Sequence, residues 1–359
     1  MFTRNKRPVM KVLSLLMGAA LAFTLTACGS GSGSASSTNE SSNTKIRLAN
    51  FGMYPSSAYL ALAIENGYFE KRGLDVQLNP PLLNSADMLN TVLNGDAELA
   101  LTAPNGVAFA RNLSKPVTIL ATTISGFPLQ IAFQPAIDKK LRSQGLTEDS
   151  PIADRVAALK GMTLGALPSG SSTDASLRYL LETNGMDPDK DLTLNPMSDQ
   201  ASMVAALRAG QIDGLVSNLG GAATAAEASG VGVLWDMMAG NETLLQYPFN
   251  VVAASESYTK SNPETIQKFL DALFEARTAL QAGLSPEDAV KIKNIVALDM
   301  DQSLYDLTME GFSPRLAEPF TTSDAAWEAS LKITNITADN PVKVPASEAI
   351  NNSFAEKVK

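Results

Sequence analysis

Apolar and polar residues follow two different periods along the chain from residue 45 onward. Residues 74–78 alternate between apolar and polar side chains, as in a half-exposed strand, whereas apolar residues at 60–64 recur at the spacing of one helix face. The same patterns predict strands at residues 46–50, 74–78, 97–101, 117–122, 129–133, 162–166, 192–194, 212–216 and 247–253. They predict helices at residues 56–64, 85–94, 105–111, 174–184, 200–209, 263–274, 285–296 and 324–333.

Strand and helix patterns alternate through most of this region, which is typical of an α/β fold in which helices cover a largely parallel sheet. The alternation restarts near Ile152. Residues 88–99 and 203–214 also share one local pattern, in which an apolar helix stops at a glycine and an acidic residue follows three positions later. Two copies of this pattern predict two similar lobes, each with its own sheet.

The composition narrows the chemistry that the chain can perform. Its 359 residues are 45% hydrophobic and 18% charged, which is typical of a globular protein with about two domains. No histidine and only one cysteine are present, which excludes histidine acid–base catalysis, Cys–His nucleophiles, His/Cys zinc sites and intramolecular disulfides. The net charge of −9 argues against nucleic acid as a partner, and the dispersed acidic residues indicate no metal site.

The N-terminal residues have the layout of a secretory signal. Residues 1–27 carry four basic side chains ahead of an apolar stretch at 12–23, which is too short for a membrane span. The sequence Leu-Thr-Ala-Cys-Gly at 25–29 resembles a bacterial lipoprotein signal, so Cys28 is the predicted lipidation site; the alternative is a buried free thiol. Residues 28–44 are rich in Gly and Ser and predict a flexible tether that follows the lipidated cysteine.

Several short motifs resemble a known family. Residues 61–76 read Ala-Leu-Ala-Ile-Glu-Asn-Gly-Tyr-Phe-Glu-Lys-Arg-Gly-Leu-Asp-Val, and further marks are residues 159–161 before a strand, residues 207–214, Tyr247-Pro248-Phe249 and Asn262-Pro263-Glu264. In this order and at these spacings they resemble the substrate-binding proteins of bacterial ABC importers. The branch in question handles nitrate, taurine, alkanesulfonates and thiamine-pyrimidine precursors.

The resemblance implies the architecture of a type II periplasmic binding protein. Two α/β lobes, comprising residues 45–127 with 248–359 and residues 128–247, would be joined by crossing segments near 127–133 and 247–253. A ligand would be held in the cleft by hinge closure. The implied partners are a small solute, an ABC permease and its ATPase, and the membrane through the lipid. No cofactor is implied, and a monomer anchored on the extracytoplasmic face of the cell membrane is expected.

Open α/β sheets bind ligands at the carboxyl ends of their strands, so we searched there for polar side chains. The turn that precedes the helix at 174–184 carries Ser169, Ser171, Ser172 and Thr173. A helix start offers unpaired N–H groups, and the hydroxyls add donors, which suits a sulfonate, carboxylate or phosphate. The alternative is that these residues only cap their own helix.

Further candidates follow other predicted strands. Tyr54 is a candidate aromatic wall for the ligand, while Ser56 and Ser57 are candidate donors; a packed surface tyrosine and simple helix caps are the alternatives. The remaining candidate ligand-binding residues, which could equally be helix caps or hinge packing, are Ser85, Thr102, Asn105, Ser217, Asn218 and Tyr247.

The leading hypothesis is therefore a lipid-anchored, non-catalytic receptor that delivers a small organic solute to a permease. A helix-start site favours an anion such as a sulfonate, taurine or nitrate, whereas the aromatic candidates leave room for a thiamine-precursor pyrimidine. A sensory lipoprotein without transport is a further alternative. Relatives that make a thiamine pyrimidine consume an active-site histidine, and this chain has none.

Overall fold

The computed structural model describes residues 43–82, 84–169, 171–197, 199–317 and 320–359. The predicted signal peptide, Cys28 and nearly all of the predicted tether lie outside the described residues. The first strand begins at Thr44, one residue before the predicted start of the folded region.

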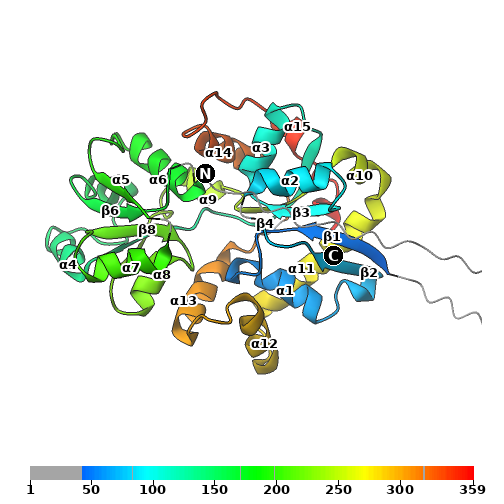
Figure 1. The fold of residues 1–359 in the computed structure, drawn as a ribbon, viewed down its shortest axis with the longest axis horizontal. Helices are drawn as coiled ribbons and strands as arrows, with labels where there is room; N and C mark the ends of the chain where they lie inside the picture. Colours follow the sequence, from blue (N-terminus) through cyan, green and yellow to red (C-terminus); the bar gives the residue numbers. More distant parts are fainter. Residues whose placement is uncertain (1–42, 83, 170, 198, 318–319) are drawn as a thin grey trace, which may run out of the picture. The chain divides into compact units, whose positions relative to one another are not determined.

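The first of two five-stranded sheets has the order β2-β1-β3-β10-β4 (Figure 1). β1 pairs in parallel with β2 and β3, whereas β10 runs antiparallel between β3 and β4, so four of the five strands share one direction. We call this sheet and the elements packed on it lobe 1. The bounds of its strands are β1 Thr44–Ala49, β2 Leu74–Leu78, β3 Leu99–Thr102, β4 Val117–Ile124 and β10 Asn250–Ser255.

The second sheet repeats this arrangement with the order β7-β6-β8-β5-β9, and its elements form lobe 2. β5 is its antiparallel strand and pairs with β8 and β9. The strand bounds are β5 Leu129–Phe133, β6 Thr163–Ala166, β7 Thr193–Pro196, β8 Gly214–Asn218 and β9 Val233–Asp236. The predicted α/β architecture with two similar lobes is confirmed, and each sheet is mixed because the strand that enters it from the other lobe runs against the rest.

Helices cover both faces of the first sheet. Leu48 and Leu99 face α1 and α11, while Ala100 and Val251 face α2 and α3 on the opposite side (Figure 1). Burial on both faces explains why these strands read as nearly continuous apolar runs. The helices of lobe 1 are α1 Ala58–Glu65, α2 Ser85–Leu93, α3 Pro104–Asn112, α10 Glu256–Ser261, α11 Pro263–Ala282, α12 Pro286–Val296, α13 Gln302–Phe312, α14 Asp324–Thr334 and α15 Ala346–Ala349.

The helices of lobe 2 are α4 Pro135–Ser143, α5 Ile152–Ala157, α6 Ser172–Thr183, α7 Gln200–Arg208, α8 Ala222–Ala228 and α9 Glu242–Gln246. Of these, α6 and α7 lie close to their predicted bounds, whereas α4, α5, α8 and α9 were not predicted. Asp199 caps α7 by accepting hydrogen bonds from the backbone N–H groups of Ala201 and Ser202. Gly210 ends the same helix at φ +70°, and Gly95 ends α2 in lobe 1 at φ +79°, a conformation in which a side chain is strained.

Two short segments join the lobes, and they lie side by side. Residues 125–128 connect β4 to β5, and residues 247–249 connect α9 to β10. The Gly126 N–H donates to the Tyr247 carbonyl at 2.7 Å, and the Phe127 N–H donates to the Leu244 carbonyl at 2.7 Å. Both crossings fall where the resemblance placed them, although residues 129–133 and 250–253 already belong to the sheets.

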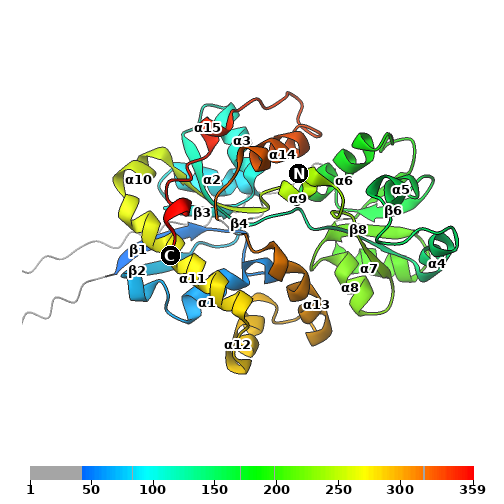
Figure 2. The ribbon, with the colours of Figure 1, turned by 180° about the vertical axis from the view of Figure 1, so that it is seen from behind.

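The C-terminal segment returns to lobe 1. The Gln267 side chain on α11 donates to the Phe354 carbonyl at 3.3 Å, which ties the end of the chain to the long helix on the outer face (Figure 2). Two helices of this segment also contact lobe 2: α14 packs against α6 and α9, and α13 packs against α8 as well as against residues 55–57 of lobe 1. Both helices therefore lie beside the space between the two sheets.

Candidate functional site

The candidate site is a cleft formed by residues of both lobes. Two adjoining cavities of about 500 and 400 Å³ make up this cleft. The residues that line both cavities are Tyr54, Ser56, Leu167, Gln200, Asn218 and Phe249. Tyr54 and Ser56 come from lobe 1, Leu167, Gln200 and Asn218 from lobe 2, and Phe249 from a crossing segment. This arrangement suits a solute held between the lobes.

On the lobe 1 side, the turn after β1 presents Tyr54 to the cleft. The buried Asn50 side chain donates to the Leu48 carbonyl at 3.0 Å and accepts from the Gly52 N–H at 2.8 Å, which fixes the path of the chain. Gly52 has φ +117°, and a Cβ there would lie 3.2 Å from a Tyr54 ring carbon. Tyr54 packs over this glycine with 54% of its surface exposed, so its ring is available to a solute.

Ser57 also lines the larger cavity, but its hydroxyl is engaged locally. It accepts from the Tyr54 N–H at 2.9 Å and donates to the Tyr54 carbonyl at 2.8 Å. Ser57 therefore holds Tyr54 in place, and Ser56 is the hydroxyl of this turn that faces both cavities.

On the lobe 2 side, Asn218 at the end of β8 is oriented by Thr173. The Thr173 hydroxyl donates to Asn218 Oδ1 at 3.0 Å. Because the amide oxygen accepts this bond, the amide nitrogen is the group that Asn218 can offer to a solute. Ser172 and Ser217 also line the cleft, and the Ser217 hydroxyl accepts from the Ala223 N–H at 2.8 Å.

Seven predicted site residues are not among those that line either cavity. Six of them are described here, and Tyr247 is described below. Packing between α2 and α3 buries Ser85, whose side chain closely approaches Gly106, and the Asn105 side chain accepts from the Gly106 N–H at 2.9 Å. Ser171 caps α6 through the Asp174 N–H at 3.1 Å. The remaining positions are Thr102, which is fully buried, Ser169, which is exposed, and Thr173, which acts through Asn218.

Tyr247 does not face the cleft in this structure either. Its ring packs edge-on against Phe127, with 5.3 Å between the ring centroids, and only 2% of the residue is exposed. Burial raises the pKa of the Tyr247 hydroxyl well above its usual range. The alternative interpretation of Tyr247, packing at the hinge, is the one that the structure favours.

Sequence reasoning missed several residues that line the cleft. Gln200 is the first residue of α7, a position equivalent to that of the serines chosen elsewhere, so the same rule could have found it. Phe249 lies in a crossing segment, two residues after Tyr247. Met300 and Phe312 come from the C-terminal segment, which strand-end reasoning does not reach.

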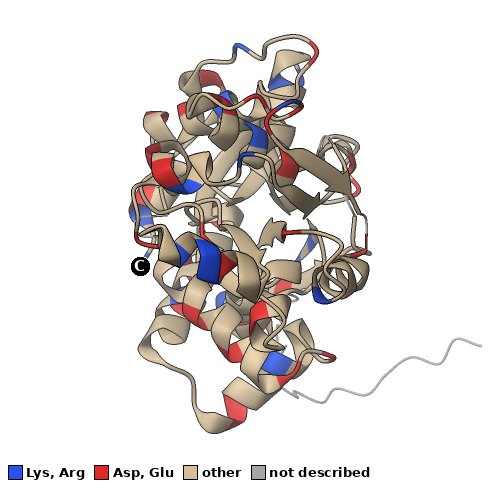
Figure 3. Ribbon diagram, turned by 90° about the vertical axis from the view of Figure 1, so that its left-hand side faces the viewer, with Lys and Arg blue, Asp and Glu red and all other residues tan. Residues whose placement is uncertain are grey.

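The cleft is apolar and carries neutral polar groups. No Asp, Glu, Lys or Arg is among the described residues that line the two cavities. Charged residues of both signs are instead interspersed over the helices (Figure 3). The starts of α6, α7 and α8 reach the cleft at Ser172, Gln200 and Gly221, and the first N–H groups of a helix lack partners within the helix.

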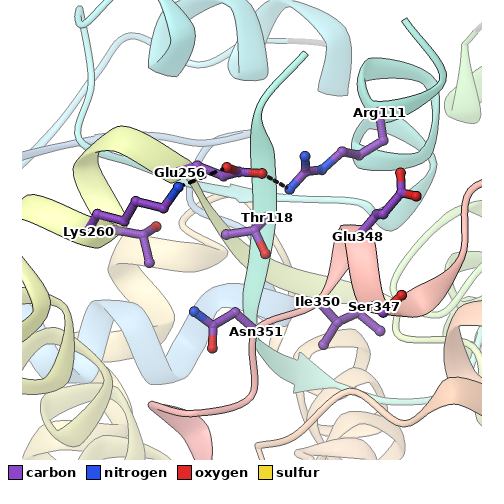
Figure 4. Close-up of a pocket in the computed structure, with 9 residues that line it drawn as sticks. Arg111, Thr118, Glu256, Lys260, Ser347, Glu348, Ile350 and Asn351 are labelled. Carbon is purple, nitrogen blue, oxygen red and sulfur yellow. Dashed lines mark hydrogen bonds and ion pairs between the residues drawn. The ribbon is translucent and has the colours of Figure 1, made fainter. Parts of the chain in front are cut away.

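A second hollow, of about 420 Å³, lies in lobe 1 between α3, α10 and α15 (Figure 4). Arg111 pairs there with Glu256 at 2.6 Å, and Lys260 pairs with the same carboxylate at 3.4 Å. The Arg111 guanidinium lowers the pKa of Glu256. Glu348 also lines this hollow, so its two basic side chains are balanced by two acidic ones, and we do not assign it as the solute site.

Within the described ranges, no group of three or more His, Cys, Asp or Glu residues is placed to hold a metal ion. None of the helices in those ranges is both long and apolar enough to cross a bilayer.

The two lobes, their paired crossings and the cleft between them have the fold of a type II periplasmic binding protein. The chain belongs to the NMT1/THI5-like family, whose model matches residues 54–289. It is 23% identical to the putative binding protein YtlA of Bacillus subtilis over 94% of both chains. It is 24% identical to the formylaminopyrimidine-binding protein of Halalkalibacterium halodurans, over 72% of this chain and 71% of that one.

Solved structures share the fold. The periplasmic aliphatic sulphonate binding protein SsuA from Escherichia coli superposes with a TM-score of 0.63 at 19% identity. The match covers 84% of this chain and 96% of SsuA. The resemblance stated from the sequence motifs is thereby confirmed at the level of family and fold.

Proposed function

We propose that this protein is the solute receptor of an ABC importer on the extracytoplasmic face of the cell membrane. It captures a small organic solute in the cleft and delivers it to the permease, whose ATPase drives transport. Family membership, relatives named as binding proteins and the two-lobed cleft support this proposal. In this proposal, lobe 1 comprises residues 45–127 and 248–359, and lobe 2 comprises residues 128–247. The protein acts as a monomer and needs no cofactor.

The solute that the cleft fits best is a flat, uncharged ring, such as a thiamine-precursor pyrimidine. The observation that carries this assignment is the lining itself: Tyr54 and Phe249 supply aromatic surface, Asn218 and Gln200 supply neutral hydrogen-bonding groups, and no described lining residue is charged. An ion taken into such a site loses its hydration without gaining an ionic partner, which is costly. One relative is named for binding a formylaminopyrimidine.

A small anion such as a sulfonate, taurine or nitrate is the second candidate. The starts of α6 and α7 at Ser172 and Gln200 favour it, because the helix dipole stabilises negative charge at a helix start. SsuA, which shares the fold, is named for binding aliphatic sulphonates.

A thermal-shift panel of residues 43–359 with pyrimidines, sulfonates, taurine and nitrate tests these assignments. A compound present at 100 times its Kd stabilises the fold by about 2.7 kcal/mol, which should raise Tm by several degrees. We expect the pyrimidines to give the largest shift and Asn218→Ala to remove it. Asn112→Ala, at an exposed position on α3, serves as the matched control. A response to anions alone would favour the second candidate, and no response to any compound would contradict both assignments.

We also propose that Cys28 is lipidated and that residues 28–44 tether the folded lobes to the membrane. The signal-like sequence before the only cysteine supports this. We expect Cys28→Ser to shift the full-length protein from the membrane fraction to the soluble fraction and to abolish labelling by a fatty-acid probe, since one anchor would be lost. Ser37→Ala in the tether should change neither measurement. A Cys28→Ser protein that still carries the label would contradict the proposal.

A sensory lipoprotein is the remaining alternative to a transport receptor. Deleting the permease gene separates the two, because uptake of the bound solute should disappear for a transport receptor. Solute-dependent signalling that survives without the permease would instead support a sensor.

A further inference from the structure

The loop that follows β8 in lobe 2 is inserted into lobe 1. Leu219 is 7% exposed and belongs to the same apolar cluster as Tyr305 and Phe312 of α13. Leu219 and its neighbours Asn218 and Gly220 all line the smaller cavity of the cleft. One short loop thus carries both a candidate solute contact and an apolar contact with the other lobe.

Glycines allow this contact to be close. A Cβ on Gly311 of α13 would lie 2.7 Å from one methyl carbon of Leu219 and 2.8 Å from the other. A Cβ on Gly220, which has φ +78°, would lie 2.9 Å from the methyl carbon of Thr308. Since real Cβ atoms do not approach other carbons so closely, a side chain at Gly311 would require Leu219 to shift, and one at Gly220 would require Thr308 to shift.

Lobe 2 completes the support of the loop from the other side. The Leu219 N–H donates to the Pro128 carbonyl at 2.9 Å, at the first crossing between the lobes. The Gly220 N–H donates to the Thr224 hydroxyl at 2.8 Å, and that hydroxyl donates to the buried Gln130 side chain at 2.8 Å. The backbone of the loop is fixed by lobe 2, while its side chain is fixed by α13.

We propose that α13 positions the Ser217–Gly221 loop for solute binding through the contact between Leu219 and Gly311. Leu219 is a positioning residue for Asn218, its neighbour in the chain, and it also lines the smaller cavity. Gly311 is not among the residues that line either cavity, so Gly311→Ala is the variant that acts on binding through the position of the loop. This inference rests on the proposed function insofar as Asn218 contacts the solute. The position of the loop itself does not depend on which solute is bound.

Hydrogen exchange without solute tests the positioning directly. We expect Gly311→Ala and Leu219→Ala each to speed amide exchange of residues 219–221 at least tenfold, while amides of β1 and β3 exchange as in the wild type. Leu219→Met, which keeps an apolar side chain of similar volume, should restore protection. Leu113→Ala, at an exposed leucine next to α3, is the matched control. Unchanged exchange in both loop variants would overturn the proposal.

A paired substitution tests whether the two residues act together. We expect Gly311→Ala combined with Leu219→Ala to protect the loop better than Gly311→Ala alone, because the shorter side chain makes room for the new Cβ. Strictly additive effects would show that the contact does not operate and would count against the proposal.

Binding measurements separate this proposal from the proposed function. With formylaminopyrimidine and taurine as probes, Kd for the probe that binds should rise about five- to twentyfold in Gly311→Ala, mainly through faster dissociation. If the wild type binds neither probe, the ligand assignment fails while hydrogen exchange still decides the role of α13. If Asn218→Ala binds normally, the route through Asn218 fails.

Discussion

Replacing Phe249 with alanine is expected to weaken solute binding about ten- to hundredfold. The Phe249 ring lines both cavities of the cleft and is held edge-on to Phe127, with 5.5 Å between the centroids. Removing an aromatic wall from an apolar site costs roughly 1.5–2.8 kcal/mol of binding energy, which corresponds to this range. Titration calorimetry with the compound that gives the largest thermal shift measures the effect.

The matched control for this prediction is Phe109→Ala on α3. Phe109 is 40% exposed and lies away from the cleft, so its loss should leave Kd unchanged. Phe249→Tyr keeps the ring and should keep most of the affinity. Equal Kd values for Phe249→Ala and the wild type would contradict the assignment of this cleft as the solute site.

The largest expected effect on stability comes from Arg155→Met in lobe 2. Arg155 is only 2% exposed, and its guanidinium donates to the Ser150 carbonyl at 2.8 Å and to the carbonyls of Asp236 and Ala239. Burial lowers the pKa of Arg155 from its ordinary value, because it removes water from the charged guanidinium. The three hydrogen bonds compensate for this lost hydration. Methionine leaves the carbonyls unpaired, which should lower the free energy of unfolding by about 3–5 kcal/mol.

Urea unfolding followed by circular dichroism measures this loss. Arg208→Met, at the exposed end of α7, is the control and should shift the free energy of unfolding by less than about 0.5 kcal/mol. Arg155→Lys should recover only part of the loss, because an ammonium does not reproduce the planar fork of donors. Equal stability of Arg155→Met and Arg208→Met would contradict the structural role assigned to Arg155.

Local sequence patterns were sufficient for most of the fold. Alternation located every strand except β9, whose four residues are mostly apolar and show no clear period. Glycine stops located the ends of α2 and α7, because the conformation that ends a helix is a local property. The helices that were not predicted are α4, α5, α8, α9, α10, α13 and α15. The support of α13, for example, comes from contacts with α8 and with residues 55–57, far away in the sequence.

The candidate site could be predicted only in part. The rule that ligands bind at strand ends led to Tyr54, Ser56, Ser172 and Asn218, which the structure brings together at the cleft. The same rule could not distinguish a free side chain from one engaged in packing. Ser85 is not among the residues that line the cleft, because it is buried where α2 and α3 approach each other closely. That approach depends on long-range packing rather than on local sequence.

The order of strands in lobe 1 has a consequence for how the chain folds. β10 lies between β3 and β4 in the middle of that sheet, yet the whole of lobe 2 separates it from them in the sequence. The strands of lobe 2 all lie within residues 129–236, so its sheet can assemble as soon as that stretch is available. Lobe 1 closes a much longer loop and must wait for residues 250–255, which makes completion of its sheet the slower event.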